Sequence, residues 1–133
     1  MVSGTGIRPL ARLLDKSKAP VWAISPAGKL IYLSPGCSEW LGFDSALLLD
    51  RRSVAGAPVS GERLDLVAAA LAAPAELRRR GTASLRITPP SVETHRPVAK
   101  EARFIRIGDE ATALTFAIAG DFDGAQIALE DML

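Results

Sequence analysis

The chain has 133 residues, of which 48% are hydrophobic, and its formal net charge is +1 at pH 7. This length and composition suit one compact domain with its own core, and so small a charge provides no global field to recruit nucleic acid or an acidic membrane. One cysteine and one histidine exclude an internal disulfide and Cys/His metal clusters, and no apolar run approaches the ~20 residues needed to cross a bilayer.

Residues 1–18 are predicted to form a tail followed by a cap helix. The tail lacks the charged-then-apolar layout of a signal peptide, so we expect a cytoplasmic protein. Ile7, Leu10 and Leu14 form an apolar stripe at helical spacing, on a helix too short to be stable alone. The stripe must therefore pack on a surface. Two alternatives stay open: the outer face of the domain's own sheet, or a second copy of the chain in a dimer.

The next segment is predicted to form a strand, a tight turn, a strand and a short helix. Val21–Ile24 and Leu30–Leu33 flank Ser25-Pro-Ala-Gly28, in which proline presets the turn and glycine can take the left-handed closing position. Ser34-Pro35 predicts a helix N-cap followed by proline at the first helical position, and Gly42 predicts the end of that helix.

Two further helical segments follow. Asp44 is a predicted N-cap for residues 45–50, and residues 51–61 are predicted to form a loop. Ser60 is then expected to cap a longer helix, interrupted by Pro74, that ends in Arg78-Arg-Arg-Gly81. Four residues of this helix recur at the spacing of a buried face: Leu64, Val67, Ala68 and Leu71.

The remainder is predicted to be β-structure. Ala83–Thr88 alternates, with Leu85 and Ile87 sharing one face, and a second pair of strands, 102–107 and 112–119, flanks a turn at 108–110. In the last strand Leu114, Phe116 and Ile118 alternate with the small residues Ala113, Thr115, Ala117 and Ala119. The pattern leaves open which of these two faces points toward the helices.

This order of elements predicts an α+β domain: a five-stranded antiparallel sheet with helices covering one face and an N-terminal helical cap. Three short motifs carry a resemblance to PAS domains across residues 8–123. Gly28-Lys-Leu-Ile-Tyr32 resembles the family's Asp-Gly-Arg-Ile element, Trp40-Leu-Gly-Phe43 its Leu-Leu-Gly-Tyr element, and Gly120-Asp-Phe-Asp123 its Asp-Ile-Thr motif. The resemblance divides the chain into the cap (1–18), a PAS core (19–120) and the start of a C-terminal linker helix (121–133).

The resemblance implies a sensory module that binds a small ligand or a partner and relays the change to an effector. The effector would be a histidine kinase, a cyclase or an ATP-driven transcriptional regulator, placed C-terminally or in a separate chain. Asp121 and Asp123 would carry the relay, and Ile7, Leu10 and Leu14 would form a homodimer interface. A ligand pocket between the sheet and its helices would be lined by Trp22, Ile24, Trp40, Leu64, Leu114 and Phe116. The alternative is a ligand-free dimerisation or interaction module.

Candidate chemistry is sparse. Cys37 has no neighbouring cation to activate it and is interpreted as a small buried residue. His95 is expected in a solvated loop, away from any haem-ligating helix, and Arg78–Arg80 complement the C-terminal end of a helix. Haem and flavin signatures, paired carboxylates and catalytic triads are all missing from the sequence, which predicts no cofactor and no enzymatic activity. We also expect no nucleic-acid or membrane partner.

Overall fold

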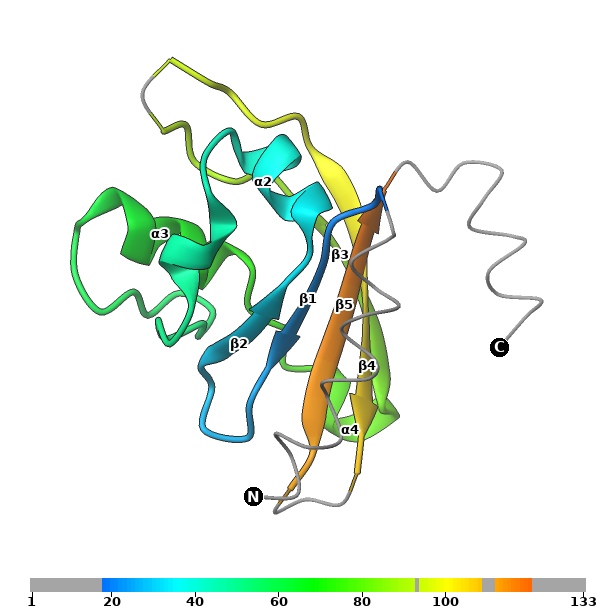
Figure 1. The fold of residues 1–133 in the computed structure, drawn as a ribbon. Coiled ribbons are helices and arrows are strands. Elements are labelled where there is room, and N and C mark those ends of the chain that lie inside the picture. Colours follow the sequence, from blue (N-terminus) through cyan, green and yellow to red (C-terminus); the bar gives the residue numbers. More distant parts are fainter. Residues whose placement is uncertain (1–17, 93, 109–111, 121–133) are drawn as a thin grey trace.

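The computed structural model describes residues 18–92, 94–108 and 112–120 of the chain. They form a five-stranded antiparallel sheet in the order β2-β1-β5-β4-β3, which confirms the predicted α+β fold. The strands are β1 (Val21–Ile24), β2 (Leu30–Leu33), β3 (Thr82–Ile87), β4 (Lys100–Ile107) and β5 (Leu114–Gly120). The first and last strands of the described chain therefore lie side by side at the centre of the sheet (Figure 1).

The first hairpin has the predicted strands and turn. The amide of Gly28 donates to the carbonyl oxygen of Ser25 at 2.9 Å, and Gly28 has a φ of 80°. That left-handed conformation costs glycine little, because it has no Cβ to clash with its own backbone. The turn sends β2 back along β1, with Trp22 opposite Leu33.

Helices α2 (Pro35–Leu41), η1 (Ser45–Leu48), α3 (Arg63–Ala70) and α4 (Leu77–Arg80) form the connection between β2 and β3. Figure 1 shows α2 and α3 on the same side of the sheet. Two of the predicted helix boundaries are confirmed: Gly42 ends α2 with a φ of 85°, and the side chain of Asp44 accepts a hydrogen bond from the amide of Ala46 at 3.0 Å.

The predicted N-cap position of Ser34, followed by Pro35, is confirmed, but the Ser34 side chain does not cap the helix. Ser34 holds the N-cap position of α2, but its hydroxyl makes no capping hydrogen bond. Instead the hydroxyl accepts from the amide of Val21 at 2.9 Å and donates to the carbonyl oxygen of Ala19 at 3.1 Å. Ser34 therefore ties the start of α2 to the start of β1, an assignment that needs contacts 13 and 15 residues apart in the chain.

The predicted start of the next helix is wrong. Glu62 holds the N-cap position of α3, whereas the Ser60 hydroxyl donates to Oδ2 of Asp65 at 2.6 Å. Arg51 binds Oδ1 of the same carboxylate at 2.7 Å. The hydrogen bonds from Ser60 and Arg51 lower the pKa of Asp65 from its ordinary value. This cluster attaches both ends of the loop between η1 and α3 to the helix.

The strand register decides which face of β5 points toward the helices. Residues paired across antiparallel strands project to the same side of a sheet. Ala117 pairs with Trp22 on one side and with Phe104 on the other, and all three belong to the core beneath the helices. Phe116 pairs with Ala23 and Ile105 on the opposite side. The small face of β5 therefore points toward the helices, and its bulky face points away from them.

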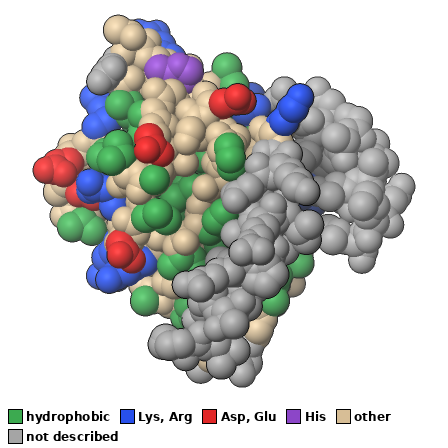
Figure 2. Space-filling view, viewed as in Figure 1, with side chains coloured by type: hydrophobic (Ala, Val, Ile, Leu, Met, Phe, Trp, Pro, Cys, Tyr) green, Lys and Arg blue, Asp and Glu red, His purple; other side chains and the backbone are tan. Residues whose placement is uncertain are grey.

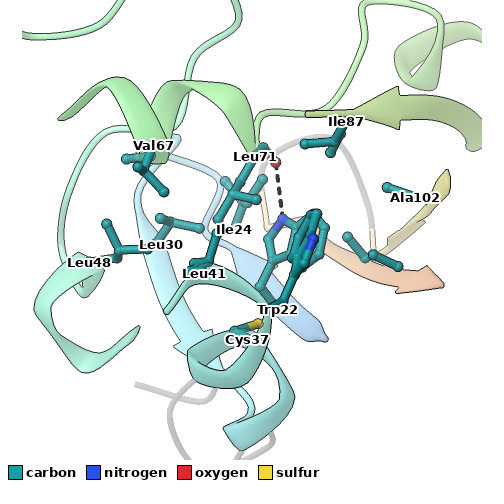
Figure 3. Packing of buried hydrophobic residues seen from close by; sticks show 14 of the residues in the cluster. Trp22, Ile24, Leu30, Cys37, Leu41, Leu48, Val67, Leu71, Ile87 and Ala102 are labelled. Carbon is teal, nitrogen blue, oxygen red and sulfur yellow. Dashed lines mark hydrogen bonds between the residues drawn. The ribbon is translucent and has the colours of Figure 1, made fainter. Parts of the chain in front are cut away.

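The core lies between the sheet and the helices. Figure 3 shows Trp22 pointing from β1 toward Leu71, with Ile24, Leu30 and Leu41 beside it. The two aromatic neighbours of Trp22 pack closely: its ring centroid lies 6.0 Å from that of Trp40 and 6.0 Å from that of Phe104. The buried face predicted for α3 is confirmed at Val67, Ala68 and Leu71, whereas Leu64 is only half-buried.

Edge strand β3 departs from the predicted pattern. Ile87 is buried, but Leu85 on the same face is 37% exposed, so only part of that face is covered. Three predicted segments lie outside the described residues: the N-terminal cap helix, the tip of the β4–β5 turn and the linker helix. Within the described ranges, no helix is long and apolar enough to cross a membrane.

Candidate functional site

The structure brings four of the six predicted pocket residues, Trp22, Ile24, Trp40 and Leu64, together in the core and places Leu114 and Phe116 on the other side of the sheet. Trp22 is fully buried, and its indole Nε1 donates to the carbonyl oxygen of Leu71 at 3.0 Å (Figure 3). Trp40 stacks on Trp22, and its own Nε1 donates to the carbonyl oxygen of Val98 at 2.7 Å. These rings fill the space between sheet and helices, and their polar atoms are satisfied by the backbone. They are core residues.

Leu114 and Phe116 were predicted to face the same pocket as Trp22, and this prediction is wrong. Phe116 pairs with Ala23, which alternates with Trp22 along β1, so its side chain projects from the opposite side of the sheet. Leu114 lies two residues earlier in β5 and shares that outer side. Ile24 is the one member of the predicted set that lines the site described next.

A groove of about 650 Å³ lies at the end of the sheet where the β1–β2 turn is found, at the bottom of Figure 1. We call it the end groove. Its lining comes from the β1–β2 turn, loop residues 53–55, residues 73–75, 77 and 78 around the start of α4, and the neighbouring ends of β4 and β5. The volume falls within the ~300–1,000 Å³ typical of small-molecule sites. The sheet and the helical layer therefore both contribute side chains to this candidate binding site.

The loop side of the end groove is held by backbone hydrogen bonds to the first hairpin. The amide of Ser53 donates to the carbonyl oxygen of Gly28 at 2.7 Å. The Ser53 hydroxyl donates to the carbonyl oxygen of Ala68, also at 2.7 Å. The amide of Leu30 binds the carbonyl oxygen of Arg51 at 3.0 Å, which extends the attachment along β2. This wall is consequently fixed to both the hairpin and α3.

Two arginines line the end groove. Arg106 belongs to β4, two residues after Phe104, so it projects toward the helical side of the sheet and is half-buried. Arg78 is exposed and reaches the groove from α4. No aspartate or glutamate is found among the described residues of the lining. The site is therefore cationic, with small apolar residues and hydroxyls for the rest of its surface.

The structure confirms the interpretation of Cys37 and corrects that of His95. Cys37 is fully buried, and burial raises the pKa of its thiol to about 11, so it is not an activated nucleophile. His95 is exposed but not simply solvated: its Nε2 lies 2.9 Å from the carbonyl oxygen of Trp40. Because a carbonyl oxygen only accepts, this nitrogen must donate, and the loop is thereby attached to the end of α2.

The remaining sequence candidates are placed as follows. Arg78–Arg80 form the last turn of α4 before left-handed Gly81, as predicted, and Arg78 also lines the end groove. Ile7, Leu10 and Leu14 of the predicted dimer interface, and Asp121 and Asp123 of the predicted relay, lie outside the described residues. In the described part of the chain no group of three or more His, Cys, Asp or Glu residues is arranged to hold a metal ion.

Sequence reasoning missed Arg106. The signal was present: in the alternation Ala102, Phe104, Arg106, a charged residue occupies a position that faces inward in the rest of the strand. The other walls carry no such signal, because residues 53–55 and 73–75 meet the hairpin only through the tertiary fold.

No protein-family model matches this sequence, and no curated protein matches it significantly. Solved structures are nevertheless similar in fold. A PAS domain from a two-component sensor histidine kinase has a TM-score of 0.60 at 12% identity, covering 89% of this chain and 97% of its own. The PAS domain of Bordetella pertussis BvgS has a TM-score of 0.63 at 11% identity, covering 96% and 93%.

An HTR-like protein from Haloarcula marismortui contributes a third example. Its PAS domain has a TM-score of 0.55 at 15% identity and covers 90% of this chain and 93% of its own. These likenesses extend over nearly the whole of each structure, and they agree with the five-stranded antiparallel sheet and its one-sided helical layer. The chain therefore has the fold of a PAS domain.

Proposed function

We propose that this chain is a sensory module that binds a small ligand in the end groove and relays the change to an effector. The observation that carries the proposal is the position of the groove, whose walls come from both layers of a PAS fold. A ligand there contacts the turn and strand ends on one side and residues 73–78 on the other. It therefore favours whichever packing of the two layers fits it best.

The same proposal gives β5 the output role. Thr115 of β5 lines the end groove, and β5 continues directly into residues 121–133. A shift in the strand end that carries Thr115 is thereby coupled to the segment containing Asp121 and Asp123. We propose these aspartates as the relay, and a histidine kinase as the effector. The kinase is supported by one similar structure, which is the PAS domain of a sensor histidine kinase.

The proposed role is non-enzymatic and leaves any catalysis to the effector. The candidate nucleophile Cys37 supports this assignment, because a buried thiol with a raised pKa is a poor nucleophile at neutral pH. Surface charge supports a small-molecule rather than a nucleic-acid or membrane partner. Over the described part of the face seen in Figure 2, acidic and basic side chains are interspersed. The net charge of the whole chain is +1.

Native mass spectrometry of freshly purified protein tests the ligand. We expect an added mass the size of a small molecule in the wild type and its loss in Ala75→Trp, which places a bulky ring in the end groove. Val98→Trp is the matched control, because Val98 is 63% exposed and lies outside this groove. Wild-type protein that carries no mass, and that binds no compound in the titrations described below, would contradict the ligand-binding role.

A ligand-free interaction module is the second candidate. It is favoured by the filled core, where Trp22, Leu71 and Phe104 occupy the space between sheet and helices. For this role we propose a homodimer through the stripe of Ile7, Leu10 and Leu14. Sedimentation of Leu10→Glu/Leu14→Glu tests it: dissociation of a wild-type dimer into monomers supports the interface, and unchanged association removes it.

A further inference from the structure

We propose that the ligand of the end groove is a small organic anion, with a carboxylate or phosphate group bound by Arg106 and Arg78 and an apolar body. This inference rests on the proposed ligand-binding function and names its chemical class.

Arg106 is the main anchor. Its place in β4 directs the side chain to the helical side of the sheet, opposite Thr115 of β5, and the residue is half-buried. The described residues include no ion-pair partner for it: their ion pairs join Arg51 to Glu62 and Asp65, and Arg86 to Glu101. A half-buried guanidinium without a counter-charge is costly, and a bound anion offsets that cost through paired, charge-assisted hydrogen bonds.

The second cation and the hydroxyls suit the same ligand group. Arg78 reaches the end groove from α4, so the anion would be held between the sheet and the helical layer. The hydroxyl-bearing residues Ser25 and Thr115 also line the groove and can donate to carboxylate or phosphate oxygens. A cationic ligand would meet two like charges here with no carboxylate among the described lining to compensate them.

Besides Ser53 and the backbone of the β1–β2 turn, the lining includes several apolar side chains, most of them short. Val54, Ala73, Pro74 and Leu77 form the helical and loop side, and Ile24 and Ala113 form the sheet side. These side chains gain free energy by covering the apolar part of a ligand. Inorganic phosphate alone would leave them uncovered, so the geometry points to an anion attached to a hydrocarbon or aromatic body.

Titrations of the full 133-residue chain followed by ¹H–¹⁵N NMR test the inference, with octanoate and octyl phosphate as anions and 1-octanol as the neutral control. We expect the anions to bind about tenfold or more tightly than octanol, with shifts at residues 24–28, 53–55 and 73–78. Arg106→Met keeps most of the aliphatic stem and should lower anion affinity several-fold toward that of octanol, with Arg78 retaining the remainder. The preferred anion, carboxylate or phosphate, identifies the ligand group.

Two controls keep the result interpretable. Arg86→Met makes the same change on β3, where the side chain is 70% exposed and 3.9 Å from Glu101, and should leave every affinity unchanged. Thermal melting without ligand should place Arg106→Met at or above the wild type, because the variant removes a half-buried charge that has no ion-pair partner among the described residues. A large fall in its melting temperature would contradict this account of Arg106.

These measurements distinguish a failure of the anion assignment from a failure of the ligand-binding function on which it rests. If octanol binds the end groove as tightly as octanoate and octyl phosphate, the anion assignment is wrong and the ligand-binding function stands. If no compound shifts the groove residues and the purified protein carries no added mass, the ligand-binding function fails as well.

Discussion

Gly42 and Gly81 end two helices in the same left-handed conformation, with φ values of 85° and 74°, but their surroundings differ. A Cβ at Gly81 would meet no atom within 4 Å. A Cβ at Gly42 would overlap with the ring of His95, which is held there by the hydrogen bond to Trp40. Gly81 is thus required by its backbone conformation alone, whereas Gly42 is also required by the close approach of the loop that carries His95.

Substitution by alanine should separate these two requirements. Gly81→Ala should lower the free energy of unfolding by about 1 kcal/mol, the cost of a left-handed alanine. Gly42→Ala should lower it clearly further. In a His95→Ala background the additional loss should shrink, because the overlapping ring is gone. Urea unfolding of the four variants measures these differences, and equal losses at both glycines would contradict the contact with His95.

Cys37 gives the protein a specific dependence on alkaline pH. Its thiol has a pKa of about 11 in the folded state against 9.0 for the unfolded chain, because of burial. Between these values the unfolded chain releases the proton more readily, so stability falls as pH rises. We expect the free energy of unfolding to drop by about 2 kcal/mol more in the wild type than in Cys37→Ala between pH 9 and 11. Parallel curves for the two proteins would show that the thiol is not buried.

At the scale of elements, β5 carries small residues on its inner face and bulky residues on its outer face. Ala117 is buried against Trp22 and Phe104, whereas Thr115 lines the end groove and is only half-buried. A strand built this way can sit beneath bulky core side chains because its own inner residues are small. The bulky residues then project from the other face, which is why Leu114 and Phe116 do not line a pocket beneath the helices.

A pair of valine substitutions on the inner face of β5 tests how tightly its two ends are packed. Ala117→Val should destabilise the protein by about 1–3 kcal/mol, because two extra methyl groups enter a filled core. Thr115→Val should change stability by less than ~0.5 kcal/mol, since the groove has room for the methyl group. Chemical denaturation measures both. A larger loss for Thr115→Val than for Ala117→Val would contradict the packing of Ala117 beneath Trp22 and Phe104.

At the scale of the whole molecule, the strand order places β1, β5 and β4 inside the sheet and leaves β2 and β3 at its edges. β1 is buried at every residue, whereas β3 is largely exposed. Interior strands are paired on both sides, so their amides should open only in the largest unfolding events. Edge amides on the unpaired side should open more readily.

Amide hydrogen exchange should follow this order. We expect the slowest exchange at Trp22, Ala117 and Phe104, and exchange faster by about tenfold or more at the outward-facing amides of β3. NMR on the full chain resolves the individual amides. If β3 were protected as strongly as β5, its free edge would be covered in solution, which would favour the interaction module over the sensor.

Local patterns were sufficient wherever the physical cause is local. The β1–β2 turn, the left-handed Gly42 and the Asp44 cap depend on residues within a few positions of one another, and all three were predicted correctly. Ser34 and Ser60 show where such reasoning fails. Each is an ordinary N-cap residue by pattern, but distant groups, the amide of Val21 and the carboxylate of Asp65, compete successfully for its hydroxyl.

The sequence by itself determined the PAS-like order of elements, the hairpin, the end of α2, the cap of η1 and the burial of Cys37, because turn chemistry, capping and periodicity act over short separations. Only the tertiary structure decided which face of β5 meets the helices, that Trp22 and Trp40 fill the core, and that Arg106 and Arg78 share a groove. Alternation along a strand defines two faces without saying which is inside. That choice is made by the volume of the side chains on neighbouring strands, which become neighbours only when the sheet forms.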